Sequence, residues 1–331
     1  MINVTFFNRN KSCGYSIYRV FQNIMPIISK KINVRELYLP SPYTNIIALL
    51  KNILFTIINM NKNDVYHITG DVHYLLYFLP SKKTIVTVHD IMHYSELSKI
   101  KKYVWKLLYI KSLNRAAKIV FISEYTKTQV LKQIHIPNFK ISVIPNAINN
   151  QMTFYKKEFN SQCPQILHIG TVKKKNLNRT IESLKGIKCH LRIIGKIDTY
   201  TLNLLKEKNI SYSYKYDISD NEIIEEYRQC DIVSFISLEE GFGMPIIEGQ
   251  LIGRVVITSN LSPMKDICGD GAFLVNPYNV KEIHTAFIKI ISDTKLREKL
   301  IYKGLINTKN YSPVKIAQKY INLYKSINNQ M

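Results

Sequence analysis

Short apolar, β-branched segments alternate with longer helical patterns along the whole chain, and this alternation constrains the fold most. Strands as apolar as these are typical of parallel sheets that helices cover on both faces. The sequence therefore predicts an α/β protein with parallel sheets. The expected strands are INVTFF, VRELYL, DVYHIT, TIVTVH, KIVFIS and ISVIP before residue 150, and QILHIG, LRIIG, YSYKYDI, DIVSFI, RVVITS and AFLV after it.

The chain has 331 residues, a length that fits two domains better than one. A polar stretch at 149–163 separates the two series of strands. We expect an N-terminal domain over 1–152 and a C-terminal domain over 160–311. In open α/β sheets ligands bind beyond the carboxyl ends of the strands, so a cleft between the domains is the expected site.

The charge is strongly basic and uneven. The net charge is +22, of which residues 1–150 carry +14 (20 basic and 6 acidic residues) and the rest +8. Such a surface favours an anionic partner: nucleic acid, anionic lipid headgroups or phosphorylated small molecules. Because the sequence has no helix-turn-helix, zinc-finger or RNA-recognition signature, we do not expect a nucleic-acid partner.

The five cysteines are odd in number, widely spaced and contain no CxxC pair, which argues against a zinc site or a disulfide framework. The N-terminal MINVTFFNRNKS reads as a strand and a loop, without the apolar run of a signal peptide. We therefore expect a cytoplasmic protein. The apolar segment 46–60 is too short to span a bilayer and contains Lys51, so we expect a packed helix there.

The stretch SLEEGFGMPIIEGQLIG (237–253) holds four of the twelve glycines. It reads as a strand end, a turn and a helix, so Gly241 and Gly243 lie where backbone amides and the helix dipole favour a phosphate or a sugar hydroxyl. Glu240 and Glu248 bracket the turn, and both carboxylates are expected to face the same side. Spacing alone leaves open that they are a helix-stabilising acid and a solvated residue.

A second loop, in LHIGTVKKKNLNRTIESLKG (167–186), follows a strand that ends at Gly170. Three lysines, 173 to 175, precede a helix that we expect to begin at about Asn176, a good N-cap residue. Cations between a strand end and a helix start suit a diphosphate. The alternative is a solvated lysine run, which is the commoner outcome for three lysines taken alone.

Polar residues also follow the expected strands of the first half, where a lone histidine would usually be structural. Their recurrence at strand ends indicates a shared site, because parallel strands end at the same edge of a sheet. The residues are Gly14, His67, Gly70, Asp71, His73, His89, Asp90, Ser123 and Asn146.

The segment EGFGMPIIEG resembles the E-x7-E signature of the retaining glycosyltransferases of family four, which have the two-Rossmann GT-B fold. IGTVKKKNL resembles the glycine-to-lysine phosphate loop of that family. TVHD, ISEYTK, VIPNAI and VITSNLSPMKDICGDGAFLVNP resemble further elements, in the family's order. The resemblance implies two Rossmann-like domains with sheets facing each other across a cleft. It also implies that the last helix, 312–331, packs back on the N-terminal domain.

The resemblance also implies roles for the matching positions. Glu240 would lie beside the donor sugar, Lys175 would neutralise the diphosphate and His89 would lie near the reacting carbon. The implied donor-binding residues are Gly14, Gly170, Thr171, Lys173, Lys174, Gly241, Phe242, Gly243, Met244 and Glu248. One departure is Thr171, which stands where the family has an arginine; Lys173 or Lys174 is the candidate replacement.

We therefore predict a retaining, metal-independent glycosyltransferase that moves a sugar from a nucleotide diphosphate sugar to a saccharide or lipid-linked saccharide of a surface polysaccharide. Lysine, backbone amides and a helix N-terminus can stabilise a leaving diphosphate without a metal. The sequence has no Asp-x-Asp pair for a metal–diphosphate complex, so no metal or other cofactor is expected. The alternatives are a non-catalytic nucleotide-sugar-binding protein and a basic nucleic-acid-binding protein.

The segment 97–118 reads as a helix with an apolar stripe that includes Ile100, Val104 and Leu107, flanked by lysines and aromatic residues. We expect the stripe to face the core and the lysines to be solvated. The alternative is that this face rests on anionic lipid, which would make the protein peripheral on the inner face of the cell membrane.

Overall fold

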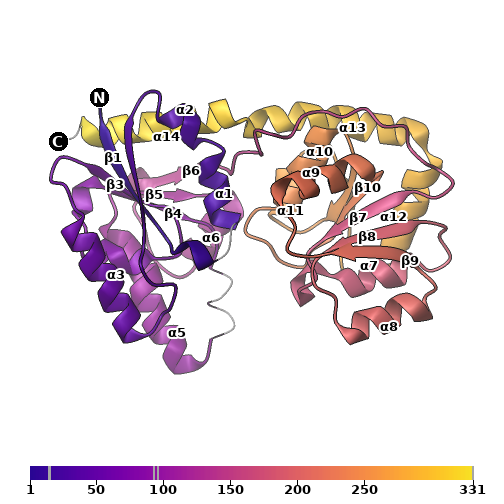
Figure 1. Cartoon of the computed structure of the whole chain (residues 1–331), viewed down its shortest axis with the longest axis horizontal. Helices are drawn as coiled ribbons and strands as arrows, with labels where there is room; N and C mark the ends of the chain where they lie inside the picture. Colours follow the sequence, from indigo (N-terminus) through magenta and orange to yellow (C-terminus); the bar gives the residue numbers. More distant parts are fainter. Residues whose placement is uncertain (14–15, 92–93, 95–96, 330–331) are drawn as a thin grey trace. The chain divides into compact units, whose positions relative to one another are not determined.

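The computed structural model describes the chain except for residues 14–15, 92–93, 95–96 and 330–331 (Figure 1). It divides into two compact units, the first formed by Met1–Asn149 with Ser312–Met331 and the second by Asn150–Tyr311. Each unit contains a six-stranded sheet in which every strand pair is parallel. All twelve expected segments form strands, so the predicted α/β class is confirmed.

The sheet of the first unit has the order β2-β1-β3-β4-β5-β6. Its central strands are apolar because helices cover both faces, and all five residues of β4 are buried. The register pairs Val4 with Val34 on one side and with Val65 on the other. The strands are β1 Asn3–Asn8, β2 Asn33–Tyr38, β3 Val65–Ile68, β4 Thr84–Val88, β5 Lys118–Phe121 and β6 Ile141–Val143.

The C-terminal helix α14 belongs to the first unit and lies beside α2 in Figure 1. Its buried face, including Tyr320 and Tyr324, packs into the same cluster as Phe6 of β1. The helical segments are α1 Ser16–Gln22, α2 Met25–Ile28, α3 Ile46–Ile58, η2 His73–Tyr77, α5 Lys99–Trp105, η4 Lys106–Ile110, η5 Lys111–Arg115, α6 Glu124–Leu131 and α14 Pro313–Asn328, with short 3-10 turns η1 Lys11–Cys13, η3 Ser81–Lys83 and η6 Asn138–Lys140.

The sheet of the second unit has the order β12-β11-β10-β7-β8-β9, so β7 and β10 are neighbours although they are far apart in sequence. The strands are β7 Gln165–Ile169, β8 His190–Ile194, β9 Ser211–Lys215, β10 Ile232–Phe235, β11 Val255–Ser259 and β12 Phe273–Val275. The helical segments are η7 Lys173–Lys175, α7 Leu177–Ser183, α8 Thr199–Glu207, α9 Asp220–Gln229, α10 Met244–Ile252, α11 Met264–Ile267, α12 Val280–Ser292, α13 Thr294–Thr308 and η8 Lys309–Tyr311.

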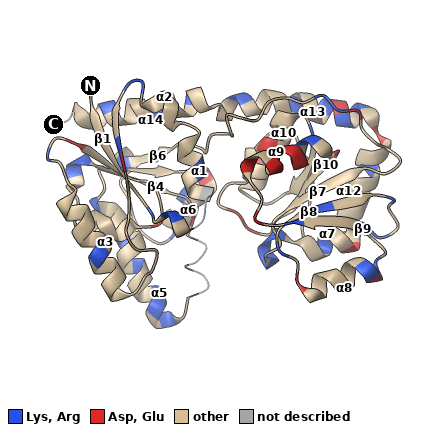
Figure 2. Ribbon diagram, viewed as in Figure 1, with Lys and Arg blue, Asp and Glu red and all other residues tan. Residues whose placement is uncertain are grey.

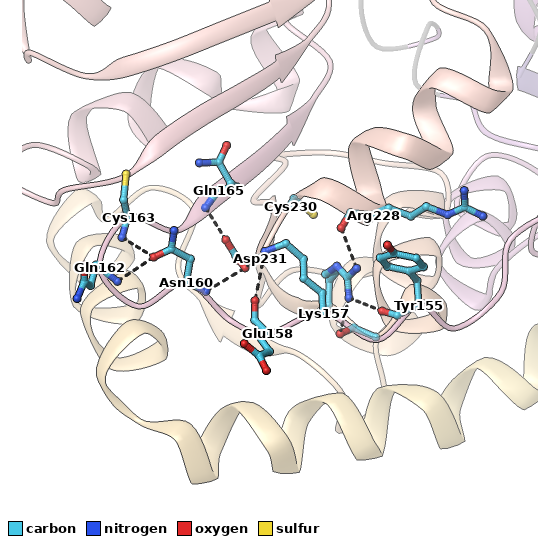
Figure 3. A network of polar contacts seen from close by, with 12 residues as sticks. Tyr155, Lys157, Glu158, Asn160, Gln162, Cys163, Gln165, Arg228, Cys230 and Asp231 are labelled. Carbon is cyan, nitrogen blue, oxygen red and sulfur yellow. Dashed lines mark hydrogen bonds and ion pairs between the residues drawn. The ribbon is translucent and has the colours of Figure 1, made fainter.

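The polar stretch at 149–163 is bound to the second unit over most of its length. The buried carboxylate of Asp231 pairs with the ammonium of Lys157 and accepts hydrogen bonds from the backbone N–H of Gln165 at 2.8 Å and of Asn160 at 3.3 Å (Figure 3). Arg254 donates to the carbonyl of Tyr155 at 2.9 Å. Attachment to the second unit therefore begins by Tyr155, before the first strand of its sheet.

Candidate active site

The loops that follow β7 and β10 lie side by side because the two strands are parallel neighbours, with His168 paired to Ser234 in the register. Backbone contacts join the loops directly. The N–H of Leu238 donates to the carbonyl of Lys174 at 2.8 Å, and the side-chain amide of Asn176 donates to the carbonyl of Ile236 at 3.1 Å. The two motifs singled out in the sequence therefore form one site at the carboxyl edge of the sheet.

At this edge the ammonium of Lys175 lies 2.6 Å from a carboxylate oxygen of Glu240. Glu240 is only 8% exposed, and the ammonium of Lys175 also lies 4.7 Å from the centre of the Phe235 ring. Both contacts are stronger in a partly dehydrated site than in water. The structure thus brings together two of the three residues for which the resemblance implies catalytic roles.

The backbone of Gly170 makes room for the lysine side chain. Its φ is +93°, and a Cβ atom there would lie 2.8 Å from Cγ of Lys175, which is too close for a non-bonded contact. The next residue, Thr171, donates its hydroxyl to the carbonyl of Lys196 at 2.6 Å. Thr171 therefore ties the loop to the end of β8 and brings no positive charge.

Asn176 is the N-cap of α7, as expected, but its side chain caps no amide of that helix. It adopts the left-handed conformation (φ 63°) and donates instead to the carbonyls of Ile236 and Pro277. Its carbonyl oxygen accepts a hydrogen bond from Arg179 at 2.9 Å. Asn176 therefore joins the loop after β7 to the loops after β10 and β12.

Arg179 is a cation that the sequence reasoning missed, although it lies only three residues after the N-cap of α7. With Thr171 and Lys173 it lines a cavity of about 390 Å³. Neither Lys175 nor Glu240 lines this cavity, which lies on the α7 side of the phosphate loop. Arg179 therefore lies beside the loop at a cavity that excludes Lys175 and Glu240, and Lys173 and Lys174 remain the predicted replacements for the family's loop arginine.

Backbone conformation and packing explain three of the glycines in the 237–253 stretch. Gly243 has a φ of +120° and is the N-cap of α10, and Gly253 ends that helix in the left-handed conformation. A Cβ atom on Gly249 would lie 2.9 Å from Cγ2 of Val233, so this glycine lets α10 approach the sheet closely. Gly249 and Gly253 therefore have packing and helix-end roles, distinct from the ligand approach predicted at Gly241 and Gly243.

Phe242 and Met244, at the turn before α10, differ in which of their atoms a ligand can reach. The ring of Phe242 is buried and packs edge-on against Tyr311 at 5.8 Å, so only its backbone can contribute to binding. Met244, the first residue of α10, is partly exposed. Gly241 is buried at the start of the turn.

Glu248 lies one turn into α10 and is held by a residue that the sequence reasoning did not select. Its carboxylate accepts a hydrogen bond of 2.7 Å from the hydroxyl of Tyr227 on α9. Burial of the phenol, and then the nearby carboxylate, raise the pKa of Tyr227 well above its ordinary value. Tyr227 therefore stays a hydrogen-bond donor and fixes Glu248.

In the first unit His89 directly follows β4. Its Nε2 lies 2.8 Å from the carbonyl of Thr69, and the Phe21 ring lies edge-on at 6.4 Å. Burial lowers the pKa of His89, and the Thr69 carbonyl offsets this in part. The imidazole is therefore neutral at pH 7. Gly14 lies outside the described residues.

Two other histidines of the first unit are core residues, contrary to the expectation that they share a site at the strand ends. His67 lies inside β3, with its ring nitrogens 2.8 Å from the hydroxyls of Tyr324 and Thr87. His73 is buried with Nδ1 2.9 Å from the carbonyl of Tyr109. Among the residues that the structure describes, no three His, Cys, Asp or Glu side chains are grouped so that they could hold a metal ion.

Comparison with known families covers both units. Residues 18–151 match the family described as Glycosyltransferase Family 4, and residues 150–305 match Glycosyl transferases group 1. The two matched regions meet where the two compact units divide. No described helix is long and apolar enough to cross a membrane.

Curated relatives share modest identity. The O-antigen chain mannosyltransferase RfbU of Salmonella typhimurium is 28% identical over 62% of this chain and 60% of its own length. The O-antigen chain mannosyltransferase B of Escherichia coli is 23% identical over 80% of this chain and 74% of its own. The capsular polysaccharide biosynthesis glycosyltransferase CapM of Staphylococcus aureus is 26% identical over 65% and 63%.

Solved structures confirm the GT-B fold. HepE of Anabaena, in complex with UDP and glucose, superposes with a TM-score of 0.79 at 14% identity and covers 98% of this chain and 100% of that one. WaaG, a glycosyltransferase involved in lipopolysaccharide biosynthesis, superposes with a TM-score of 0.74 at 12% identity, over 97% and 99%. The two family matches together span residues 18–305, and they show that the chain is a glycosyltransferase whose N-terminal part matches Glycosyltransferase Family 4 and whose C-terminal part matches Glycosyl transferases group 1.

Proposed function

We propose that this protein transfers a sugar from a nucleotide diphosphate sugar to a saccharide acceptor in the assembly of a surface polysaccharide. The observation that carries the proposal is the ion pair of Lys175 and Glu240 at the joined ends of β7 and β10. The relatives named for O-antigen and capsular polysaccharide synthesis support the acceptor class. The UDP and glucose in the HepE complex support the donor class.

In this proposal Lys175 has two successive partners. A diphosphate that enters beside it would compete with Glu240 for the ammonium and would leave the Glu240 carboxylate to accept hydrogen bonds from the donor sugar. As the bond to the diphosphate breaks, negative charge grows on the leaving group, and a fixed cation and the N-terminus of α10 stabilise that charge. Glu248, held by Tyr227, would bind the ribose hydroxyls.

We further propose that transfer retains the configuration of the donor and needs no metal or other cofactor. The fixed cations of the phosphate loop and the α10 N-terminus support this, since they offer the leaving diphosphate the charge that a metal would otherwise supply. His89, which is neutral at pH 7, would lie on the acceptor side as a hydrogen-bonding group. We propose a cytoplasmic location at the inner face of the cell membrane, where a lipid-linked acceptor is available.

A donor screen tests the proposal. Thermal unfolding is measured with UDP, GDP and ADP and their sugars. A ligand that binds only the native state raises the free energy of unfolding by about 2.7 kcal/mol at a hundredfold excess over its Kd. Nuclear magnetic resonance of the product made from an α-linked donor, with and without EDTA, then follows. An α-linked product at an unchanged rate in EDTA supports retention without metal.

Three results would contradict the proposal. Donor binding without any transfer would indicate a nucleotide-sugar-binding protein. A β-linked product, or loss of transfer in EDTA, would overturn retention or metal independence. Steeply salt-dependent DNA binding with no nucleotide-sugar binding would indicate a nucleic-acid-binding protein.

A further inference from the structure

Helix α3 departs from the usual amphipathic pattern, although Leu49, Ile53 and Phe55 still pack in part on the core. Its buried residues are Ala48, Asn52 and Thr56, four apart on one face. Its exposed residues are nearly all aliphatic, with exposures from 44% to 76%, whereas a helix that covers a sheet normally turns its aliphatic face inward. The exposed aliphatic side chains are Ile46, Ile47, Leu50, Leu54, Ile57 and Ile58.

Polar contacts fix α3 in this orientation. The buried amide of Asn52 donates to the carbonyl of Ser41 at 3.1 Å and to the hydroxyl of Tyr74 at 3.0 Å, while its oxygen accepts from the N–H of Ser41 at 3.0 Å. Thr56 bonds back to the carbonyl of Asn52. Rotating the aliphatic face inward would expose or break these bonds, which is costly for buried polar groups. The predicted helix over 46–60 is confirmed, and it packs on the core through Leu49, Ile53 and Phe55, but most of its aliphatic side chains face outward.

The apolar stripe in 97–118 is also exposed, although its pattern predicts that it faces the core. Ile100 is 82% exposed, and Val104 and Leu107 are 49% and 42% exposed. Two aromatic residues of this segment turn inward instead, since Trp105 stacks on Tyr109 with ring centres 5.0 Å apart, whereas Tyr103 is exposed. Aliphatic side chains thus face outward in both segments.

The two segments form one surface because both pack on η2. Tyr74 bonds to Asn52 of α3, and its ring lies 5.9 Å from the ring of Tyr109 at the end of η4. The hydroxyl of Tyr77 donates to the carbonyl of Leu107 at 2.8 Å. Figure 1 labels α3 and α5 at the same end of the first unit. We call the exposed face of Ile46–Ile58 and Lys99–Ile110 the α3/α5 surface.

The charge on this surface has one sign. Lys51 of α3 and Lys99 and Lys101 of α5 are exposed, and Lys102 and Lys106 accompany them. The sequence has no Asp or Glu at 37–63 or at 97–123. Figure 2 shows the basic residues on α3 and α5. A second copy of the chain placed on this face would bring lysines against lysines, so self-association is disfavoured.

We propose that the α3/α5 surface docks on an anionic lipid bilayer, with α3 lying in the plane of the interface. The aliphatic side chains would enter the boundary of headgroups and acyl chains, and the lysines would meet the lipid phosphates. Tyr43 and Tyr103, both exposed, suit the same interface. The thirteen residues of α3 are too few to span the hydrocarbon core, so the contact is peripheral.

The surface lies in the unit that contains His89, and α5 begins at Lys99, ten residues after His89. If the proposed transfer reaction holds, docking would deliver a lipid-linked acceptor to this unit. The docking proposal itself does not depend on transfer, because lipid binding is measured without donor or acceptor.

The test is flotation of the full chain with vesicles of neutral phosphatidylcholine and with vesicles that also contain phosphatidylglycerol, at low and high salt. The wild type should bind the anionic vesicles more tightly, by roughly fivefold for each lysine engaged, and high salt should reduce that preference. The variant with Ile46, Leu50 and Leu54 changed to Ser should lose at least roughly tenfold in affinity for both vesicles. Lys99→Glu with Lys101→Glu should lose only the anionic preference.

The matched control changes Ile288, Tyr302 and Ile306 to Ser, which are also exposed apolar residues but lie in the second unit. This control should float like the wild type, and circular dichroism should show that every variant is folded. An equal loss of vesicle affinity in the control and in the α3 variant would overturn the proposal. So would unchanged flotation of the α3 variant, or a concentration-dependent dimer that only the α3 variant abolishes in the absence of vesicles.

Discussion

Helices α3 and α10 are both apolar in sequence, yet they turn opposite faces to the protein. In α10, Ile246, Ile247 and Ile252 are buried, and Gly249 lets the helix lie close to β10 and β11. In α3 most of the isoleucines and leucines face outward because Asn52 finds partners inside, although Leu49 and Ile53 still pack on the core. Burial is thus decided by what the small and polar residues of a helix can contact. The inward face of α10 supports a site, and the outward face of α3 offers a surface.

The largest expected effect is on the transfer rate, which should depend on the turn before α10 and not on the exposed face of α3. Glu240→Gln at the start of the α10 turn should lower the transfer rate by about two to three orders of magnitude, or roughly 3–4 kcal/mol, because the amide cannot act as a charged partner. The α3 variant carrying three serines should keep its rate with an acceptor supplied in detergent. Initial rates with the donor found in the screen measure both.

The control for these two variants is Asp270→Asn. Asp270 forms an exposed ion pair with Lys303 in the same unit, at 2.9 Å, so its loss should leave the rate unchanged. Near-normal turnover by Glu240→Gln would show that the assignment of the loop after β10 is wrong.

A second, smaller effect compares the cores of the two units. His67 in β3 and His168 in β7 are buried as neutral rings, and burial lowers the pKa of each to about 3. The unfolded chain, with an ordinary pKa of about 6.5, binds more protons between these values, so stability is lost as the pH falls from 6.5 towards 3. Each histidine should contribute a loss of roughly 1.4 kcal/mol for each pH unit in this window.

Urea unfolding at pH 7 and pH 5 measures this loss. His67→Gln and His168→Gln should each flatten the dependence of the free energy of unfolding on pH, even if they also lower that free energy at pH 7. His190, on β8, is only half-buried and bonds to Ser211 and Ser213, and burial lowers its pKa less than that of a fully buried ring. His190→Gln is therefore the matched control and should change the slope less. Parallel pH dependences in the wild type and both core variants would contradict this account.

The smallest effect tests the orientation of the two helices directly. Ile246→Val in α10 removes a buried methylene and should destabilise the protein by about 1 kcal/mol. Ile47→Val in α3 makes the same chemical change at a position that is 68% exposed and should change stability by less than about 0.5 kcal/mol. Urea midpoints measure both; equal losses would mean that α3 is buried like α10.

The strands were predictable from sequence because each buried parallel strand carries its own local apolar signal, and the same holds for the positions of Gly170 and Asn176 at a strand end and a helix start. The meeting of Lys175 and Glu240, 65 residues apart, was not predictable from local signals, since it depends on β7 and β10 being neighbours in the sheet. The direction of α3 depends in the same way on Tyr74, a tertiary partner of Asn52. Arg179 went unnoticed because a single arginine in a helix carries no pattern.

The central claim is that the loops after β7 and β10 bind the diphosphate of the donor. Isothermal titration of the wild type, Lys175→Met and the control Lys303→Met with UDP, GDP and ADP tests it most directly. We expect the wild type and the control to bind one of these nucleotides equally. Lys175→Met, which removes the ammonium beside Glu240, should bind it roughly tenfold to a hundredfold more weakly. Equal affinity in all three proteins, or no binding by the wild type, would contradict the claim.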